Sequence, residues 1–124
     1  MPLVFTYGTL KQGQRNHFIL RYSSYYGLAT LAFKARMFDV GFPVLMSSRS
    51  ILKVEGEVYI VDAATLRRLD SLESNGRMYK RRQKRLPDGR RVWVYIGMNG
   101  FWEPRKYGKP VLPDEDGTVR WRAQ

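Results

Sequence analysis

The chemistry open to this chain is bounded by the reactive side chains that it contains. The 124 residues include no cysteine and a single histidine, His17. Thiol nucleophiles and disulfides are therefore excluded, a metal site with several histidine ligands is impossible, and a Ser-His-Asp triad would have to use His17. Carboxylates and main-chain groups remain as candidates for a reactive site, and a metal site built from carboxylates alone stays open.

Glu73 stands out among the carboxylates because of its position after a predicted helix. Residues 63–72 predict a short helix that begins after Asp62 and places Leu66, Leu69 and Leu72 on its apolar side. Glu73 follows Leu69 by four residues and therefore points to that same side. A carboxylate there loses hydration, which raises its pKa and makes it a better proton carrier near neutrality. The next residues, Ser-Asn-Gly, are a strong helix stop, so the residues alone equally allow Glu73 to turn outward.

Two further carboxylates share one face of a predicted strand. Residues 51–61 alternate apolar and polar side chains, and Glu55 and Glu57 fall together on one face. They could serve acid–base chemistry, remain solvated on a barrel exterior, or pair with the many arginines. We favour a structural role for both.

A possible ligand cradle follows the first predicted strand. Residues 4–6 predict a short buried strand, which Tyr7-Gly8-Thr9-Leu10 then breaks. Gly8 permits an unusual backbone and lets a ligand approach the main chain closely. Consecutive N–H groups at such a turn can hold an anion, although an ordinary strand-to-loop turn explains the same residues.

The remaining elements must position these groups. Asn16 is a plausible helix N-cap, and the turn after it would carry Phe18, Ile19 and Tyr22 inward, with His17 as a structural hydrogen-bonding residue rather than a substrate ligand. The sequence further predicts a strand over 31–35, a turn at 41–43, a buried segment at 44–46, a polar loop at 47–50 and a hairpin of 80–86 with 90–96 across Pro-Asp-Gly. Aromatic anchors follow in the tail: Phe101, Trp102, Tyr107 and Trp121.

Composition favours one compact domain over residues 1–124, because 44% of the residues are hydrophobic. No apolar run is long enough for a signal peptide or a membrane span, so we expect a cytoplasmic protein. The formal net charge is +11, which attracts anions, including nucleic acid and acidic metabolites. The predicted hairpin interleaves basic and aromatic residues in a way that can bind nucleic acid, although a charge run is more often a solvated face.

Two motifs together resemble a known enzyme family. Residues 4–13 read Val-Phe-Thr-Tyr-Gly-Thr-Leu-Lys-Gln-Gly and are followed by Asn16 and His17. Leu-Asp-Ser-Leu-Glu at 69–73, followed by Met-Tyr-Lys-Arg-Arg at 78–82, forms the second motif. This pattern is similar to the gamma-glutamylcyclotransferase family, and most similar to its branch acting on gamma-glutamylamines. The resemblance covers roughly residues 3–17 and 54–96.

The resemblance implies an α+β fold, a small, mostly antiparallel β-barrel with short helices packed on it. It implies that the α-amine of a small gamma-glutamyl substrate attacks its own γ-carbonyl, forming 5-oxoproline and releasing an amine or amino acid without a cofactor or metal. Glu73 takes the place of the family's catalytic acid–base group. The candidates for substrate binding are Tyr7, Gly8, Thr9, Leu10, Tyr79 and Tyr107.

A second hypothesis belongs to another functional class. The chain could keep this fold and act as a basic interaction module that binds nucleic acid or an acidic partner without catalysis. The charge and the arginine-rich hairpin motivate it. The sequence leaves the leaving group of the substrate and the oligomeric state open.

Overall fold

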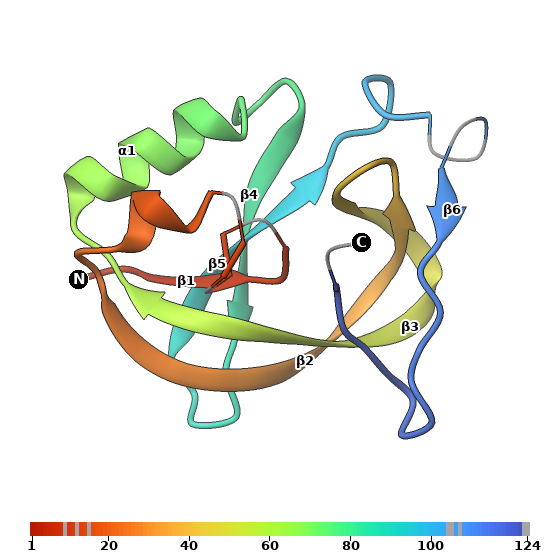
Figure 1. Cartoon of the computed structure of the whole chain (residues 1–124), viewed down its shortest axis with the longest axis horizontal. Coiled ribbons are helices and arrows are strands. Elements are labelled where there is room, and N and C mark those ends of the chain that lie inside the picture. The colour runs from red at the N-terminus through yellow and green to blue at the C-terminus, as the bar shows by residue number, and fades with distance from the viewer. Residues whose placement is uncertain (9, 12, 15, 104–105, 107, 123–124) are drawn as a thin grey trace.

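The computed structural model describes residues 1–8, 10–11, 13–14, 16–103, 106 and 108–122. In this part of the chain, seven strands form a single sheet that curls into a half-barrel (Figure 1). Along the sheet the strands follow the order β4-β5-β1-β3-β2-β6, and β7 pairs with β3. The strands are β1 (Leu3–Thr6), β2 (Ser24–Asp39), β3 (Pro43–Ile60), β4 (Tyr79–Arg85), β5 (Arg91–Gly97), β6 (Lys109–Pro110) and β7 (Thr118–Val119). The predicted small, mostly antiparallel α+β barrel is thereby confirmed.

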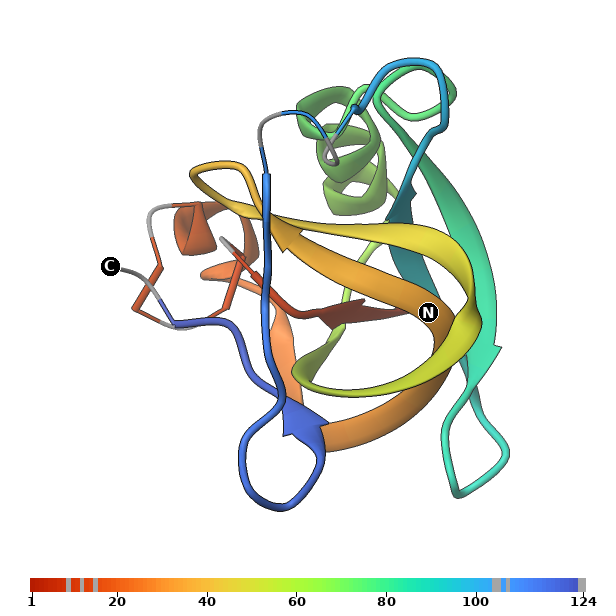
Figure 2. The ribbon, with the colours of Figure 1, turned by 90° about the vertical axis from the view of Figure 1, so that its right-hand side faces the viewer.

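The long β2–β3 ribbon forms the wall of the half-barrel. In Figure 2 it bends around the interior of the sheet. Lys34 pairs with Ile51, whereas the next residue, Ala35, pairs with Ser47, so residues 48–50 bulge out of the ladder. The predicted polar loop at 47–50 is therefore wrong, because β3 continues through it. A bulge bends and twists a strand without ending it, and its polar side chains imitate a loop in the sequence.

The helix α1 (Ala63–Leu72) has the predicted bounds. The side chain of Asp62 caps it by accepting a hydrogen bond from the main-chain N–H of Thr65 at 2.7 Å. Leu69 is fully buried, Leu66 is partly buried, and Leu72 is exposed at the end of the helix. α1 therefore packs through the middle of its apolar side and leaves its last turn near the surface.

The short 3₁₀ helix η1 (His17–Leu20) lies beside α1 (Figure 1). It buries Leu20, whereas Phe18 and Tyr22 are exposed. The prediction that Phe18 and Tyr22 point inward is wrong, because a 3₁₀ helix has three residues per turn and aligns residue 17 with residue 20.

Both faces of the central strands are covered by apolar side chains. Phe5 of β1 and Val94 of β5 belong to the cluster inside the half-barrel. Val4 and Tyr95, on the same strands, belong to a second cluster that includes Leu69 of α1. The first strand is thus sandwiched between the barrel interior and the helix.

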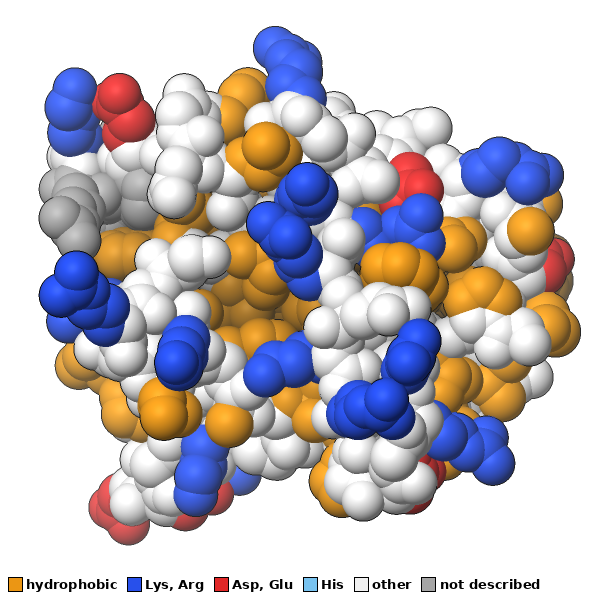
Figure 3. Space-filling model, turned by 180° about the vertical axis from the view of Figure 1, so that it is seen from behind, with side chains coloured by type: hydrophobic (Ala, Val, Ile, Leu, Met, Phe, Trp, Pro, Cys, Tyr) orange, Lys and Arg blue, Asp and Glu red, His pale blue; other side chains and the backbone are white. Residues whose placement is uncertain are grey.

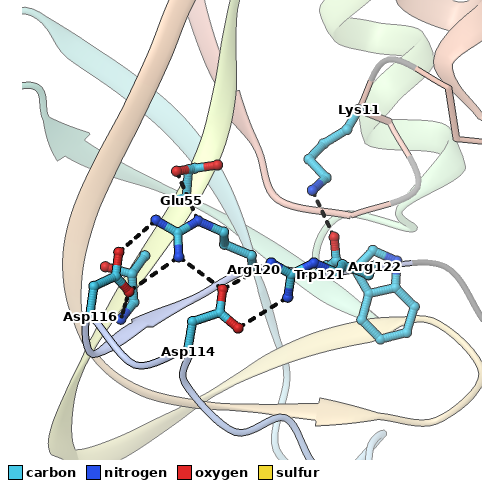
Figure 4. A network of polar contacts seen from close by, with 8 residues as sticks. Lys11, Glu55, Asp114, Asp116, Arg120, Trp121 and Arg122 are labelled. Atoms are coloured by element: carbon cyan, nitrogen blue, oxygen red, sulfur yellow. Dashed lines mark hydrogen bonds and ion pairs between the residues drawn. The ribbon is translucent and has the colours of Figure 1, made fainter.

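The C-terminal segment is attached by a network of polar contacts (Figure 4). Arg120 binds Glu55 of β3 at 3.0 Å and also Asp114 and Asp116. Nζ of Lys11 donates to the main-chain oxygen of Trp121 at 2.9 Å. The end of the described chain is therefore tied both to the sheet and to the loop that follows β1.

Positive charge is distributed widely over the surface. Figure 3 shows Lys and Arg side chains standing around a hollow in which hydrophobic side chains are visible. No helix in the described part of the chain is long and apolar enough to span a membrane.

Candidate active site

A pocket of about 210 Å³ opens where β1, α1 and the start of β4 meet. Its lining comes from five places in the chain. They are β1 with its following loop (Phe5, Thr6, Tyr7, Gly8, Leu10), Asn16, the β2–β3 turn (Phe42, Pro43), the end of α1 (Leu72, Glu73), and the β4–β5 hairpin with the residue before it (Met78, Tyr79, Tyr95).

The pocket brings together predicted site residues that are distant in the sequence. Tyr7, Gly8 and Leu10 line it together with Glu73 and Tyr79. Thr9 and Tyr107, which were also predicted, lie outside the described residues. The loop after β1 and the carboxylate after α1 therefore share one pocket, and the roles assigned to these residues stay predictions.

Glu73 both ends the helix and belongs to the pocket. It is the C-cap residue of α1, and its main-chain N–H donates to the oxygen of Leu69 at 2.9 Å. Burial removes water from the carboxyl group and raises its pKa to about 7. The two alternatives drawn from the sequence are thus both partly right, because the chain turns at Glu73 while its side chain stays in the pocket.

Three tyrosine side chains of the pocket lie close enough to Glu73 for its charge to affect their pKa values. Burial raises the pKa of Tyr7, Tyr79 and Tyr95, and the negative charge of Glu73 adds to the rise in each case. Their hydroxyl groups are therefore neutral across the physiological range and can donate hydrogen bonds. Among the described residues that line this pocket, Glu73 is the group that titrates near neutral pH.

The tyrosines are fixed by different partners. The hydroxyl of Tyr7 donates to the main-chain oxygen of Tyr95 at 2.6 Å, so Tyr7 uses its hydroxyl to join β1 to β5. The hydroxyl of Tyr95 donates to Asp70 Oδ1 at 2.6 Å, and Arg81 pairs with the same oxygen at 3.0 Å. The guanidinium of Arg81 also lies over the ring of Trp93, 4.2 Å from its centre. These contacts fasten α1 to the β4–β5 hairpin beside the pocket.

Gly8 lets the pocket loop approach the β2–β3 turn. A Cβ atom at this position would lie 2.4 Å from Cγ of Pro43, which is closer than carbon atoms can pack. Nδ1 of His17 contacts the main-chain oxygen of Leu10 at 2.9 Å, and because a carbonyl only accepts, Nδ1 is the donor. His17 therefore supports the loop from behind, in agreement with the structural role expected for it.

The structure adds pocket residues that the sequence did not reveal. Asn16 was predicted as an N-cap, but its side chain makes no cap hydrogen bond and it lines the pocket. Phe42 was recognised only as part of a turn. Tyr95 was recognised only as part of an alternating strand, and because both faces of β5 are buried, the alternation could not show which face meets a pocket.

Among the described residues, no group of three or more His, Asp or Glu side chains is arranged to hold a metal ion. The pocket offers one carboxylate, neutral hydroxyl groups and main-chain atoms. Such a set can move a proton and donate hydrogen bonds to a small polar substrate.

Comparison with known proteins places this site in a family context. Residues 4–122 match the family model described as "Gamma-glutamyl cyclotransferase, AIG2-like". A Vibrio cholerae protein assigned as a gamma-glutamylcyclotransferase is 39% identical over 95 residues, which cover 76% of this chain and 80% of that protein. The human gamma-glutamylaminecyclotransferase is 38% identical over 92 residues, which cover 65% of this chain and 59% of the human protein.

A solved structure agrees with the sequence comparison. The crystal structure of a mouse AIG2-like protein superimposes with a TM-score of 0.72 and 27% sequence identity, and the match covers 85% of this chain and 81% of the mouse chain. The chain therefore belongs to the gamma-glutamyl cyclotransferase, AIG2-like family, whose named members are enzymes.

Proposed function

We propose that this protein cyclises a small gamma-glutamyl amine or peptide to 5-oxoproline and releases the amine. The family supports cyclotransferase activity in general. The observation that carries the specific reaction is the carboxyl group of Glu73, whose pKa burial raises to about 7 in a pocket shared with Gly8 and Leu10. A group that titrates near the working pH can both accept and return a proton.

The proposed reaction is intramolecular. The neutral α-amine of the substrate attacks the γ-carbonyl carbon, forming the ring C–N bond, and Glu73 takes the proton that the amine loses. The bond between the γ-carbon and the leaving nitrogen then breaks, and Glu73 returns the proton to that nitrogen. The reaction consumes neither water nor another reactant. The pocket therefore has to hold the substrate in the bent conformation that brings its α-amine to the γ-carbonyl carbon.

The loop after β1 is proposed to hold the glutamyl part. Main-chain N–H groups in the segment 7–10 would bind the substrate carboxylate or the oxygen that becomes negative during the attack. Tyr79 is proposed to contact the substrate within the pocket. Thr9 and Tyr107 keep their proposed binding roles. We further propose that residues 1–124 act as one domain in the cytoplasm.

A first test combines a substrate panel with one substitution. Release of 5-oxoproline is measured from gamma-glutamyl alkylamines, gamma-glutamyl-ε-lysine and gamma-glutamyl amino acids. With a confirmed substrate, Glu73→Gln should lower kcat by about two to four orders of magnitude, because the amide keeps the shape but cannot accept the proton.

Glu57→Gln is the matched control for this substitution. Glu57 lies on β3 outside the pocket lining and accepts a hydrogen bond from the hydroxyl of Tyr59 at 2.9 Å. This variant should keep most of the activity. If Glu73→Gln turns over at the wild-type rate while Glu57→Gln is inactive, Glu57 rather than Glu73 carries the proton transfer.

A further inference from the structure

A second pocket, of about 690 Å³, is lined in part by Trp102, whose side chain packs on residues of the first pocket. Nε1 of Trp102 donates to the main-chain oxygen of Met78 at 2.8 Å. The indole ring packs 5.5 Å from the ring of Phe42 and 5.7 Å from the ring of Tyr79. Met78, Phe42 and Tyr79 line the first pocket and Trp102 lines the second, so these contacts bring the two pockets close together.

The second pocket is cationic, unlike the first. Arg36, Arg49 and Lys106 line it, together with Glu103 and neutral polar residues. Glu103 forms an ion pair with Lys106 at 3.1 Å. Neither arginine forms an ion pair with any described residue, so the two guanidinium groups add positive charge beside Trp102. This environment favours a bound anion.

The proposed reaction requires a place for the part of the substrate that departs. Ring closure keeps the glutamyl part beside Glu73, and the group on the leaving nitrogen needs space of its own next to the 210 Å³ pocket. A site of 690 Å³ is large enough for an amino acid or a short peptide. The contact between the rings of Trp102 and Tyr79 places this space close to the first pocket, on the side where β4 begins.

We infer that the second pocket binds the leaving group of the gamma-glutamyl substrate and that it favours leaving groups that carry a carboxylate over uncharged alkyl amines. This inference rests on the proposed function and specifies its substrate class. Arg36 and Arg49 determine the preference by attracting the carboxylate. Exposed ion pairs are individually weak, so the expected preference is roughly tenfold and decreases as salt screens the charges.

The test compares two substrates that differ by a single carboxylate. Gamma-glutamyl-alanine and gamma-glutamyl-ethylamine have the same glutamyl part, and ethylamine is alanine without its carboxyl group. In the wild-type protein at low salt, kcat/KM should be roughly tenfold higher for the alanine compound. The ratio should fall toward one in Arg36→Gln/Arg49→Gln, through loss on the alanine compound alone, and it should also fall for the wild type at high salt.

A charge-matched control separates the pocket from the overall field. Arg67→Gln/Arg82→Gln removes the same net charge from exposed positions outside both pockets and should leave the ratio unchanged. Release from both compounds at equal kcat/KM in the wild type, or equal loss of the ratio in both double variants, overturns the inference and leaves the proposed function intact. Failure to release 5-oxoproline from any gamma-glutamyl compound overturns the proposed function, and this inference with it.

Discussion

At the scale of single residues, Glu73 is the group on which the pocket's proton chemistry depends. Burial raises its pKa to about 7, and its charge helps to keep Tyr7, Tyr79 and Tyr95 protonated. The hydroxyl groups of Tyr7 and Tyr95 donate to protein partners, so among these tyrosines Tyr79 is the candidate for contact with a substrate. Asp70, one turn earlier on α1, lies beside Arg81 and Tyr95, so the two carboxylates of this motif have different surroundings.

The pH dependence of activity should reveal the titration of Glu73. The ionised carboxylate is the form that accepts the amine proton, so kcat/KM should fall as pH drops below about 7, approaching a tenfold loss per pH unit. This inflection should stay in place for substrates whose own amines titrate at different pH values. An inflection near the ordinary glutamate value of about 4.3 would mean that the carboxyl group is solvated during turnover.

At the scale of elements, sequence motifs correctly predicted the helix and the hairpin, because neighbouring residues determine these elements. The Asp62 cap and the leucine spacing gave α1 its bounds, and Pro-Asp-Gly gave the β4–β5 hairpin. The 48–50 bulge is set by the register in which β3 pairs with β2, which the serines themselves do not reveal, so they suggested a loop. The loop after β1 and Glu73 were candidates from their residue types and family resemblance, whereas Asn16 and Phe42 join the pocket only through tertiary contacts.

The close approach of the pocket loop to the β2–β3 turn can be tested at Gly8. In Gly8→Ala the new Cβ would overlap Cγ of Pro43, so the loop or the turn must move. We expect a loss of about 1–3 kcal/mol in the free energy of unfolding and a higher KM, measured by urea denaturation and steady-state kinetics. Adding Pro43→Ala removes the overlapping atom and should recover part of both losses. A fully stable and active Gly8→Ala would show that this contact does not shape the pocket.

The basic hairpin offers a second test at this scale. Lys84 and Arg90 lie over the rings of Phe33 and Tyr26, away from the pocket lining, whereas Arg81 pairs with Asp70. Lys84→Gln/Arg90→Gln should keep kcat/KM within about twofold, since surface charges contribute little to a distant site. Adding Arg81→Gln should lower stability by about 1 kcal/mol through loss of its ion pair with Asp70. A large loss of activity in the folded double variant would show that the hairpin charge serves the site.

At the scale of the whole molecule, positive charge is left uncompensated over most of the surface. Glu55, Asp114 and Asp116 all bind Arg120 in the C-terminal network (Figure 4). These three carboxylates therefore gather around one arginine, while Lys and Arg side chains are spread over the surface (Figure 3). A net charge of +11 attracts anions to the molecule in general. The comparisons with known proteins do not support the alternative of a noncatalytic basic module.

The pocket should also lower the stability of the molecule above neutral pH. The pKa of Glu73 is about 7 in the folded protein, against an ordinary value of 4.5 for a solvated glutamate, so the folded state holds this proton more tightly. The associated stability is complete below pH 4.5 and is lost as pH rises through 7, by about 3 kcal/mol. Glu73→Gln lacks this loss and should be more stable than the wild type at pH 8 but not at pH 4. Urea denaturation at both pH values measures it, and a variant less stable than the wild type at pH 8 would contradict the burial argument.

The position of β1 between β3 and β5 has a consequence for the order in which the molecule is made. A ribosome adds roughly 5–20 residues per second, so the first strand emerges seconds before its partners. Phe5 pairs with Val58 and Val4 pairs with Trp93, so both contacts form only after these later residues have been synthesised. The contact of Lys11 with Trp121 spans 110 positions of the chain. Non-local pairing of this kind also slows folding in the free chain. The segment proposed to bind the substrate is thus synthesised before the strands and the C-terminal segment that hold it in the fold.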